Sequence, residues 1–476
     1  MPIKINNSLT PKKLLPKITR LFELSAGKIL GIENDWNPEA GAPVFTVKGK
    51  YTARGWTDWT QGFQFGSALL QFDATGEKRF LEIGRAHTLQ RMAAHVSHTG
   101  VHDHGFNNIS TYGNLWRLMR EGKIPHQEPD LAVYELALKV SGAIQAARWT
   151  RIAGGHGYIY SFNGPHSLFI DTLRSLRSLA VAHQLGHKLM SEGDTQISLL
   201  ERLIEHAGTT ARFNVFYGEA RDVYDVRGRT AHESIFNLND GQYRCPNSQQ
   251  GYSPFSTWTR GLAWAILGFA EELEFLNTLP DDALPPGQKG QTSVAHTWQK
   301  AAEATADFYL QNCCADGVPV WDTGARNLHR MGDYQKKAAD PYNVWEPVDS
   351  SAAVIAAQGL IRLGNYLANG NAREKAARFR QAGLTLASTL FDEPYLSSAS
   401  HHQGLILHSV YHRPRGWDYV APGQKVPNCE SSMWGDYHAR ELGLLLLREA
   451  QGAVYPTFFG PRPASAPPNT RSPSRD

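Results

Sequence analysis

The chain has 476 residues, of which 20% are charged and 11% aromatic, and its formal net charge is +3. A chain of this length buries a large core, and no basic run interleaved with aromatic residues points to a nucleic-acid partner. No run approaches the roughly 18 apolar residues that a membrane span needs, so we expect no membrane partner.

Neither the N-terminus nor the cysteines indicate export. Residues 1–10 are polar and lack the apolar core of a secretory signal. Cys245, Cys313, Cys314 and Cys429 have spacings that match neither a zinc site nor a disulfide framework. We therefore expect free thiols in a reducing compartment, and a cytoplasmic protein.

Helical periodicity dominates the chain. It predicts about twelve helices, without the alternation of strands and helices that would build a parallel sheet. The predicted helices span residues 11–31, 61–75, 77–97, 110–122, 130–148, 171–188, 194–207, 256–278, 292–312, 350–365, 371–390 and 435–451. A double ring of inner and outer helices accommodates this series. Because no linker interrupts residues 10–455, we predict one domain.

Long polar loops rich in aromatic residues separate several of these helices. They cover residues 151–170, 208–255, 315–349 and 391–434. Loops of this length in a compact protein usually carry function, so we expect them to gather over one mouth of the double ring. Short strands are predicted within them at 213–217 and 405–411. After Tyr455 the chain is rich in Pro, Ser and Arg, which predicts a disordered tail over 456–476.

Two aspartates stand where predicted helices begin. Asp103 lies in the sequence HDHGFNN shortly before the helix 110–122, and Asp171 lies at the start of the helix 171–188. Either could simply cap its helix, since such a carboxylate contributes about 1 kcal/mol by accepting hydrogen bonds from the first amides. Two carboxylates at helix starts among aromatic and amide side chains are also what general acid and base chemistry on a sugar requires. Both are therefore candidate catalytic residues.

A second cluster stands at the start of the helix 256–278. Trp258, Arg260 and Trp264 crowd its first turns, where a cap formed by Ser256 or Thr257 and two buried indoles would be the structural explanation. Arg260, however, is a planar donor that matches a carboxylate, and indoles offer stacking faces for a sugar ring. Together they could bind a uronic acid.

Other polar residues are less specific. His232 lies in a loop, where it could hydrogen-bond to a substrate or simply be a surface residue. Asp349 and Asp436 each stand near a helix start and are predicted to be caps. Four histidines surround Asp103, but no Cys or Glu completes a familiar ligand pattern, so we predict neither a metal nor a cofactor. These are His95, His98, His102 and His104.

Taken in order, these blocks resemble the unsaturated glucuronyl hydrolases, family 88 of the glycoside hydrolases. The shared blocks are WTQGF from Trp59, HDHGF around Asp103, IDTL around Asp171, QGYS and WTRGLAW from Gln250 to Trp264, DSSAA from Asp349 and WGDY from Trp434. The resemblance implies an all-α, six-fold α/α barrel with Asp171 as the general acid/base and Asp103 as its essential partner. It also implies a sugar subsite formed by Trp59, His232, Gln250, Trp258, Arg260 and Trp264.

The resemblance further implies the reaction. Its substrate is the end left by a polysaccharide lyase, a uronic acid with a C4=C5 double bond. Asp171 would protonate C4, positive charge would develop at C5 and the ring oxygen, and water activated by the same group would add at C5. The resulting hemiketal opens and releases the remaining sugar. A proton donor at pH 7 needs a raised pKa, and we expect Asp103 and the aromatic walls to raise the pKa of Asp171.

Three alternatives stay open. An unsaturated rhamnogalacturonyl hydrolase shares fold and mechanism but differs in the neighbouring sugar. A conventional inverting glycosidase would need two carboxyls roughly 6 to 10 Å apart. A non-catalytic sugar-binding protein has no use for two unpaired carboxylates facing an anionic sugar. Departures from the family pattern at Gln64, His104 and Gln249 bear on which substrate is bound rather than on the acid.

Overall fold

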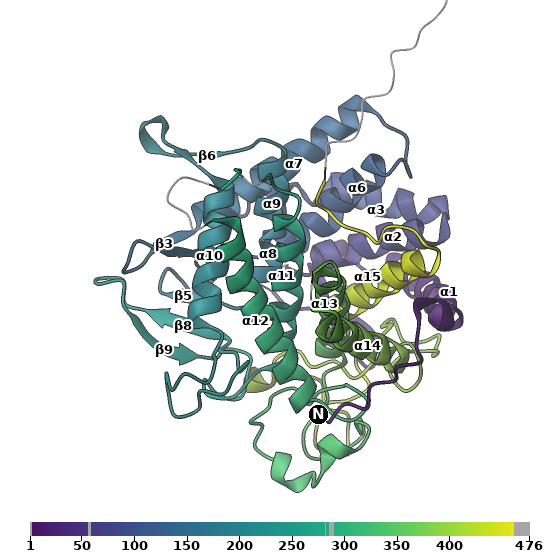
Figure 1. The fold of residues 1–476 in the computed structure, drawn as a ribbon. Coiled ribbons are helices and arrows are strands. Elements are labelled where there is room, and N and C mark those ends of the chain that lie inside the picture. The colour runs from purple at the N-terminus through teal and green to yellow at the C-terminus, as the bar shows by residue number, and fades with distance from the viewer. Residues whose placement is uncertain (1, 56–58, 281, 285–289, 371, 461–476) are drawn as a thin grey trace, which may run out of the picture.

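The computed structural model describes residues 2–55, 59–280, 282–284, 290–370 and 372–460. Its helices alternate along the chain between an inner and an outer ring (Figure 1). The inner ring is formed by α2 (Gln61–Thr75), α5 (His104–Asn107) with α6 (Asn114–Arg120), α8 (Thr172–Ser175) with α9 (Arg177–Gln184), α11 (Thr259–Leu276), α13 (Ser350–Ala368) and α15 (Met433–Ala450). The outer ring is formed by α1 (Pro11–Asp35), α3 (Lys78–Arg91), α7 (Glu128–Ala147), α10 (Leu199–Phe213), α12 (Gln291–Asn312) and α14 (Arg373–Leu390). The predicted six-fold α/α barrel is confirmed.

Burial explains which helices lie inside. Helices α11, α13 and α15 are buried on nearly every face, whereas an outer helix such as α10 buries one apolar stripe. Glycines let the inner helices approach closely. A Cβ on Gly359 of α13 would lie 2.7 Å from the backbone nitrogen of Leu267 on α11.

Each predicted helical segment contains a helix, but three are interrupted. The segment 77–97 divides into α3 and α4 (Ala93–Val96), and 171–188 divides into α8 and α9. The segment 110–122 begins with a π-helical turn, Ile109–Gly113, that leads into α6. Side-chain periodicity continues through each interruption, which is why the sequence does not reveal them.

The strands are short and antiparallel, and they flank the barrel. They pair as β1 (Pro43–Val47) with β2 (Lys50–Ala53), β3 (Trp149–Arg151) with β4 (Gly157–Ile159), β6 (Leu189–Met190) with β7 (Gln196–Ile197), and β5 (Ser167–Phe169) with β8 (Glu233–Phe236) and β9 (Tyr243–Asn247). The strands predicted at 213–217 and 405–411 are wrong. Those segments make isolated bridges only, such as Val215 with Thr230 and Ile406 with Leu396.

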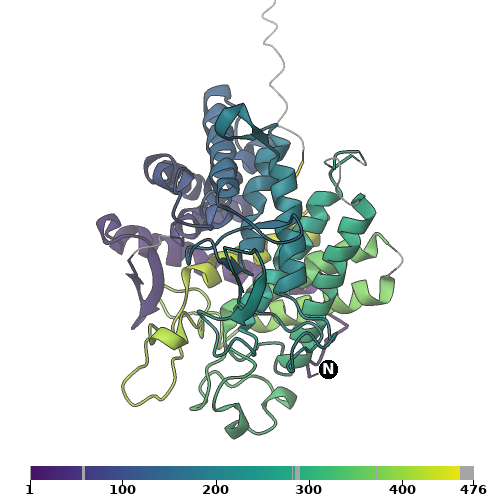
Figure 2. The ribbon, with the colours of Figure 1, turned by 90° about the vertical axis from the view of Figure 1, so that its left-hand side faces the viewer.

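The inner helices begin at one end of the barrel. Trp59, which precedes α2, stacks on Trp434 in the first turn of α15 with ring centroids 5.1 Å apart. Two of the four long loops lie together, as predicted. The green and yellow-green loops 315–349 and 391–434 lie side by side at the bottom of Figures 1 and 2.

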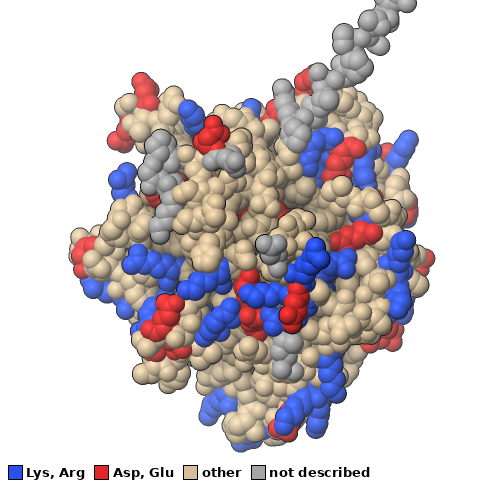
Figure 3. All heavy atoms as spheres, in the orientation of Figure 1, with Lys and Arg blue, Asp and Glu red and all other residues tan. Residues whose placement is uncertain are grey.

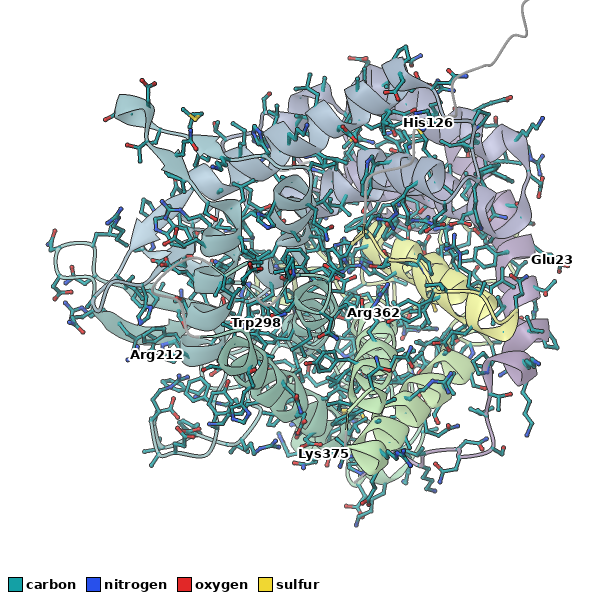
Figure 4. All side chains as sticks on the ribbon, turned by 45° about the horizontal axis from the view of Figure 1, so that its top comes forward. Glu23, His126, Arg212, Trp298, Arg362 and Lys375 are labelled. Atoms are coloured by element: carbon teal, nitrogen blue, oxygen red, sulfur yellow. The ribbon has the colours of Figure 1, made fainter. Side chains whose placement is uncertain are left out.

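Buried ion pairs fill the middle of the barrel interior and extend toward the opposite helix ends. Arg174 is buried between Glu271 and Glu441, each 2.7 Å from a guanidinium nitrogen. Arg362, labelled within the ring in Figure 4, pairs with Glu274 at 2.7 Å. By contrast, both signs of charge are interspersed over the face shown in Figure 3, which agrees with the small net charge.

The C-terminal segment closes that end of the barrel. Phe458 is 3% exposed, and the Cζ atom of Arg177 lies over its ring, 5.1 Å from the ring centroid. Arg362 donates a hydrogen bond to the carbonyl of Pro456. The first residues of the predicted tail therefore pack on the barrel, whereas residues 461–476 lie outside the described part of the chain.

The cysteines are unpaired, with Cys313 and Cys314 buried and Cys245 and Cys429 exposed. Among the described residues, no helix combines the length and the apolar character that crossing a membrane requires.

Candidate active site

A pocket opens where the inner helices begin. It encloses about 760 Å³ of empty space that is open to solvent. Aromatic rings, arginines and both candidate carboxylates form its wall. It is lined by Arg54, Gly55, Trp59, His102, Asp103, Phe106, Phe162, Asp171, Gln249, Gln250, Trp258, Arg260, Trp264, Tyr411, His412, Arg415 and Trp417.

The structure brings the predicted site residues together, and all but His232 line the pocket. His232 lies behind the wall, with its ring 4.7 Å from that of Trp258. Its Nδ1 accepts hydrogen bonds from the backbone amides of Gln249 and Gln250, at 2.9 and 3.3 Å. Its Nε2 is buried without a hydrogen-bond partner among the described residues. His232 therefore holds the glutamine pair in place and keeps one donor unused.

Asp103 and Asp171 immediately precede α5 and α8, but neither side chain caps its helix. The alternative that they are only caps is therefore wrong. Asp349 does cap α13, accepting hydrogen bonds from the amides of Ser351 and Ala352. The cap predicted at Asp436 is wrong, because that carboxylate accepts hydrogen bonds from the chain near Leu405 while Ser432 caps α15.

One histidine bridges the two free carboxylates. The Nε2 atom of His102 lies 3.3 Å from Oδ1 of Asp171 and 3.6 Å from Oδ1 of Asp103. Asp103 and Asp171 are 7% and 8% exposed, so little water screens them. The sequence places His102 next to Asp103 but contains no signal that its ring also reaches Asp171.

The bridge sets the protonation of the carboxylates. Burial alone would raise the pKa of Asp171, but the hydrogen bond and charge of His102 hold that pKa below its usual value. Burial raises the pKa of Asp103. The expectation that Asp103 raises the pKa of Asp171 is therefore wrong, because the nearest charge to Asp171 is an imidazole and not a carboxylate.

Arg260 is tied into the wall of the pocket. Its guanidinium lies between the rings of Trp258 and Trp434, 4.6 and 4.7 Å from their centroids. It donates to the side-chain oxygen of Gln250 at 2.8 Å and to the carbonyl of Tyr411 at 2.9 Å. The cap expected from Ser256 or Thr257 is absent, since Trp258 is the N-cap and makes no side-chain cap.

The sequence analysis did not identify several residues of the pocket wall, including Arg54, Arg415 and Trp417. Arg54 and Arg415 lie 5.7 and 5.1 Å from the ring of Trp417, and Arg54 also donates to the Trp417 carbonyl. The loop 391–434 was expected to carry function, but its contact with the end of β2 joins residues more than 360 positions apart. The motif Arg413-Pro-Arg-Gly-Trp417 was the available signal for this cationic and aromatic cluster.

The histidines around Asp103 make protein contacts. His104 bonds through its two ring nitrogens to the Ser141 hydroxyl and the His98 carbonyl, and Asn107 bonds to His95. Within the described ranges no group of three His, Cys, Asp or Glu side chains has an arrangement that could hold a metal ion.

The comparisons with known proteins agree with this arrangement. No family model matches the chain. The unsaturated glucuronyl hydrolase of Bacillus sp. strain GL1 is 25% identical over 417 residues, which are 85% of this chain and 90% of that protein. The unsaturated chondroitin disaccharide hydrolase of Streptococcus agalactiae is 22% identical over 452 residues, 92% of this chain and 96% of that protein.

The solved structures place the fold in the same group. The crystal structure of unsaturated glucuronyl hydrolase from Bacillus sp. GL1 matches with a TM-score of 0.65 and 22% identity, over 92% of this chain and 97% of that one. The chain is thus a relative of the unsaturated glucuronyl hydrolases and has their α/α-barrel fold.

Proposed function

We propose that this protein is a glycoside hydrolase that removes an unsaturated (C4=C5) glucuronic acid from the non-reducing end of oligosaccharides made by polysaccharide lyases. The observation that carries the proposal is a pair of carboxylates at helix starts, Asp103 and Asp171, that cap nothing and share one histidine in an aromatic pocket. A buried carboxylate that caps no helix has lost its hydration without gaining hydrogen bonds from the helix amides. Such a costly arrangement fits a chemical role better than a structural one.

The reaction assigns Asp171 the role of acid and base. Its protonated carboxyl gives a proton to C4, and positive charge develops at C5 and the ring oxygen. The resulting carboxylate accepts a proton from the water that adds at C5, after which the hemiketal opens and releases the aglycone. Asp103 lines the same pocket, and its carboxylate can accept a hydrogen bond from a sugar hydroxyl. Its negligible solvent contact strengthens that bond.

The aromatic wall supplies the sugar subsite. We assign stacking faces to Trp59, Trp258 and Trp264, and a supporting role to His232, which shapes the subsite from behind by holding the backbone of Gln249 and Gln250. Gln250, held by Arg260, presents its amide to the same space. At the mouth, we place the aglycone on Trp417 between Arg54 and Arg415, where an anionic group on the neighbouring sugar meets two cations.

The geometry disfavours a conventional inverting glycosidase. Both Oδ1 atoms lie within 3.6 Å of one nitrogen, so they are no more than about 7 Å apart, near the lower limit of the separation that inversion uses. His102 also lies between them, where the anomeric carbon and its water would have to fit. An unsaturated rhamnogalacturonyl hydrolase stays open, because it uses the same acid.

We further propose that residues 10–455 form one catalytic domain, because a single ring of helices runs through them. The unpaired state of the cysteines supports a cytoplasmic location.

The test is loss of the C4=C5 ultraviolet absorbance on incubation with unsaturated disaccharides from chondroitin, hyaluronan, gellan, ulvan and rhamnogalacturonan lyase digests. Loss on glucuronyl substrates that disappears in Asp171→Asn, but not in the exposed control Asp240→Asn, is expected. Activity confined to rhamnogalacturonan products would favour the sister reaction. Cleavage of saturated glycosides alone would overturn the proposal.

A further inference from the structure

His102 occupies a position that the reaction described above does not use. The residue is 1% exposed, and its ring packs against Phe162 and Phe169, whose centroids are 5.9 and 5.5 Å away. Its backbone carbonyl accepts a hydrogen bond from the amide of Gln145. Its Nδ1 is buried without a hydrogen-bond partner among the described residues, so Nε2 makes the only polar contacts that the ring shows there.

We call Asp103, His102 and Asp171 the carboxylate–histidine trio. Two bare carboxylates this close in a buried site repel each other, and a proton on the nitrogen between them offsets both charges. The charged or titratable groups facing the trio from other elements are Arg148 after α7, His98 before α5, His206 on α10, His232 before β8 and Arg260 on α11.

His102 binds a proton more readily than His206, another buried histidine that faces the trio. Burial alone would lower the pKa of His102, but Asp103 and the hydrogen bond to Asp171 raise it above its usual value. Burial dominates at His206, whose pKa falls to about 3, so that side chain stays neutral. The short contact between His102 and Asp171 and these directions favour a charged imidazole beside an ionised Asp171, whereas the first step of the reaction needs a protonated Asp171.

We propose that His102 loads Asp171 with the proton that the reaction delivers to C4, and that the trio keeps one proton between turnovers. The distance of 3.3 Å between Nε2 and Oδ1 is within hydrogen-bond reach, and the two phenylalanine rings fix the orientation of the imidazole. An anionic uronate that expels water from the pocket favours the transfer, because it disfavours the negative charge on Asp171.

The steps balance. The Nε2–H bond breaks as an O–H bond forms on Asp171, which leaves a neutral imidazole. The O–H bond then breaks as the proton goes to C4, and the π electrons form the C4–H bond. Water adds to C5 and gives a proton to Asp171, which returns it to Nε2. Each turnover begins and ends with the proton on His102, and one water molecule is consumed.

Because this inference rests on the proposed hydration reaction, the test starts from the wild-type chain. Wild-type protein that leaves the C4=C5 absorbance unchanged would refute the proposed function itself. If the wild type is active, His102→Gln separates the roles, since its amide reaches the same space but cannot transfer a proton. We expect kcat to fall at least about 100-fold while KM changes less than about threefold.

The pH profile distinguishes proton loading from support of the fold. In His102→Gln only the two carboxylates can hold the proton of the trio, and they lose it at a lower pH than an imidazole does. The alkaline limit, which is the pH above which kcat/KM falls, is therefore expected to move down by about one pH unit or more. His206→Gln is the matched control, because His206 is an equally buried histidine that contacts neither carboxylate in the described structure, and its alkaline limit should not move. A loss of kcat in His102→Gln with an unchanged alkaline limit would overturn the proposal.

A direct measurement covers the case in which His102→Gln does not fold. Nitrogen NMR of histidine-labelled wild-type protein should show the His102 ring as an imidazolium at neutral pH, and Asp103→Asn should lower the pH at which that ring loses its proton. A neutral His102 ring across the active pH range would also overturn the proposal, whatever the activity of the variants.

Discussion

Asp171 and Asp349 hold equivalent places, each the residue before the first turn of an inner helix, yet only Asp349 caps its helix. The Asp349 carboxylate accepts hydrogen bonds from two amides and the Ser351 hydroxyl. The Asp171 carboxylate meets only His102 among the hydrogen-bond partners in the described structure. The same residue type in the same position thus performs a structural task in one helix and stays available for chemistry in the other.

This contrast predicts opposite outcomes for the same substitution. Asp171→Asn should lower kcat by about 100-fold or more while costing less unfolding free energy than Asp349→Asn, because no cap is lost and the only hydrogen-bond partner in the described structure is His102. Asp349→Asn should cost about 1 to 3 kcal/mol, because it disturbs buried hydrogen bonds. Urea unfolding and steady-state kinetics measure both effects. A destabilised Asp171→Asn with intact turnover would contradict the assignment.

At the mouth of the pocket, Arg415 is predicted to select the aglycone. Arg415→Ala should raise KM about three- to fivefold for substrates with a charged neighbouring sugar and leave neutral ones unchanged, because a partly exposed ion pair contributes up to about 1 kcal/mol. Arg413→Ala is the matched control, since Arg413 lies on the same turn but does not line the pocket. Equal effects of both substitutions would exclude a specific contact.

Among the helices, the distance between Asp103 and Asp171 depends on how closely α5 and α8 pack. Gly105 lies against the backbone of Ser175, where a Cβ would come within 2.3 Å of the carbonyl oxygen. The Ser175 hydroxyl also accepts a hydrogen bond from the Gly105 amide, at 2.7 Å. The absence of a side chain at Gly105 therefore keeps both carboxylates within reach of His102.

Gly105→Ala should force these helices apart. We expect a loss of about 1 to 3 kcal/mol in the free energy of unfolding, together with a fall in kcat, since the carboxylates lose their common partner. Gly27→Ala in α1 is the control, because nothing lies within 4 Å of its added Cβ, and it should stabilise by about 0.5 to 1 kcal/mol. Thermal unfolding and kinetics report both. A Gly105→Ala variant with normal activity and stability would show that α5 and α8 can pack farther apart without harm.

The sequence predicted helices more accurately than loops, for physical reasons. Helix α2 has the predicted bounds because its hydrogen bonds and its periodicity are local. The segments 213–217 and 405–411 have strand composition but find no partner long enough to form a ladder. Likewise, Asp103 and Asp171 were identified from local motifs, whereas the reach of His102 and the position of Trp417 depend on contacts between distant segments.

For the whole molecule, buried histidines predict acid lability. Burial lowers the pKa of several described histidines, most strongly at five of them: to about 4 for His104, His408 and His438, and to about 3 for His206 and His412. Below about pH 6.5 these histidines bind protons in the unfolded chain but stay neutral in the folded protein. The free energy of unfolding therefore falls as the pH falls toward the histidine pKa values of the folded protein. Each such histidine contributes up to about 1.4 kcal/mol per pH unit in that range.

Urea unfolding at pH 7.5, 6 and 5 measures this loss. We expect the midpoint to fall steadily with pH, and His206→Gln to show a shallower dependence than the wild type, because one of the buried groups no longer titrates. A midpoint that stays constant over this range would mean that the buried histidines titrate normally.

The common direction of the inner helices has an effect beyond packing. Each helix carries partial positive charge at its first turn, and the described inner ring directs these ends at the pocket. Such a field attracts a polyanion from a distance and accelerates its capture. Added salt should therefore lower kcat/KM while leaving kcat nearly constant, so that ionic strength would govern how fast the enzyme finds chain ends in a dilute digest.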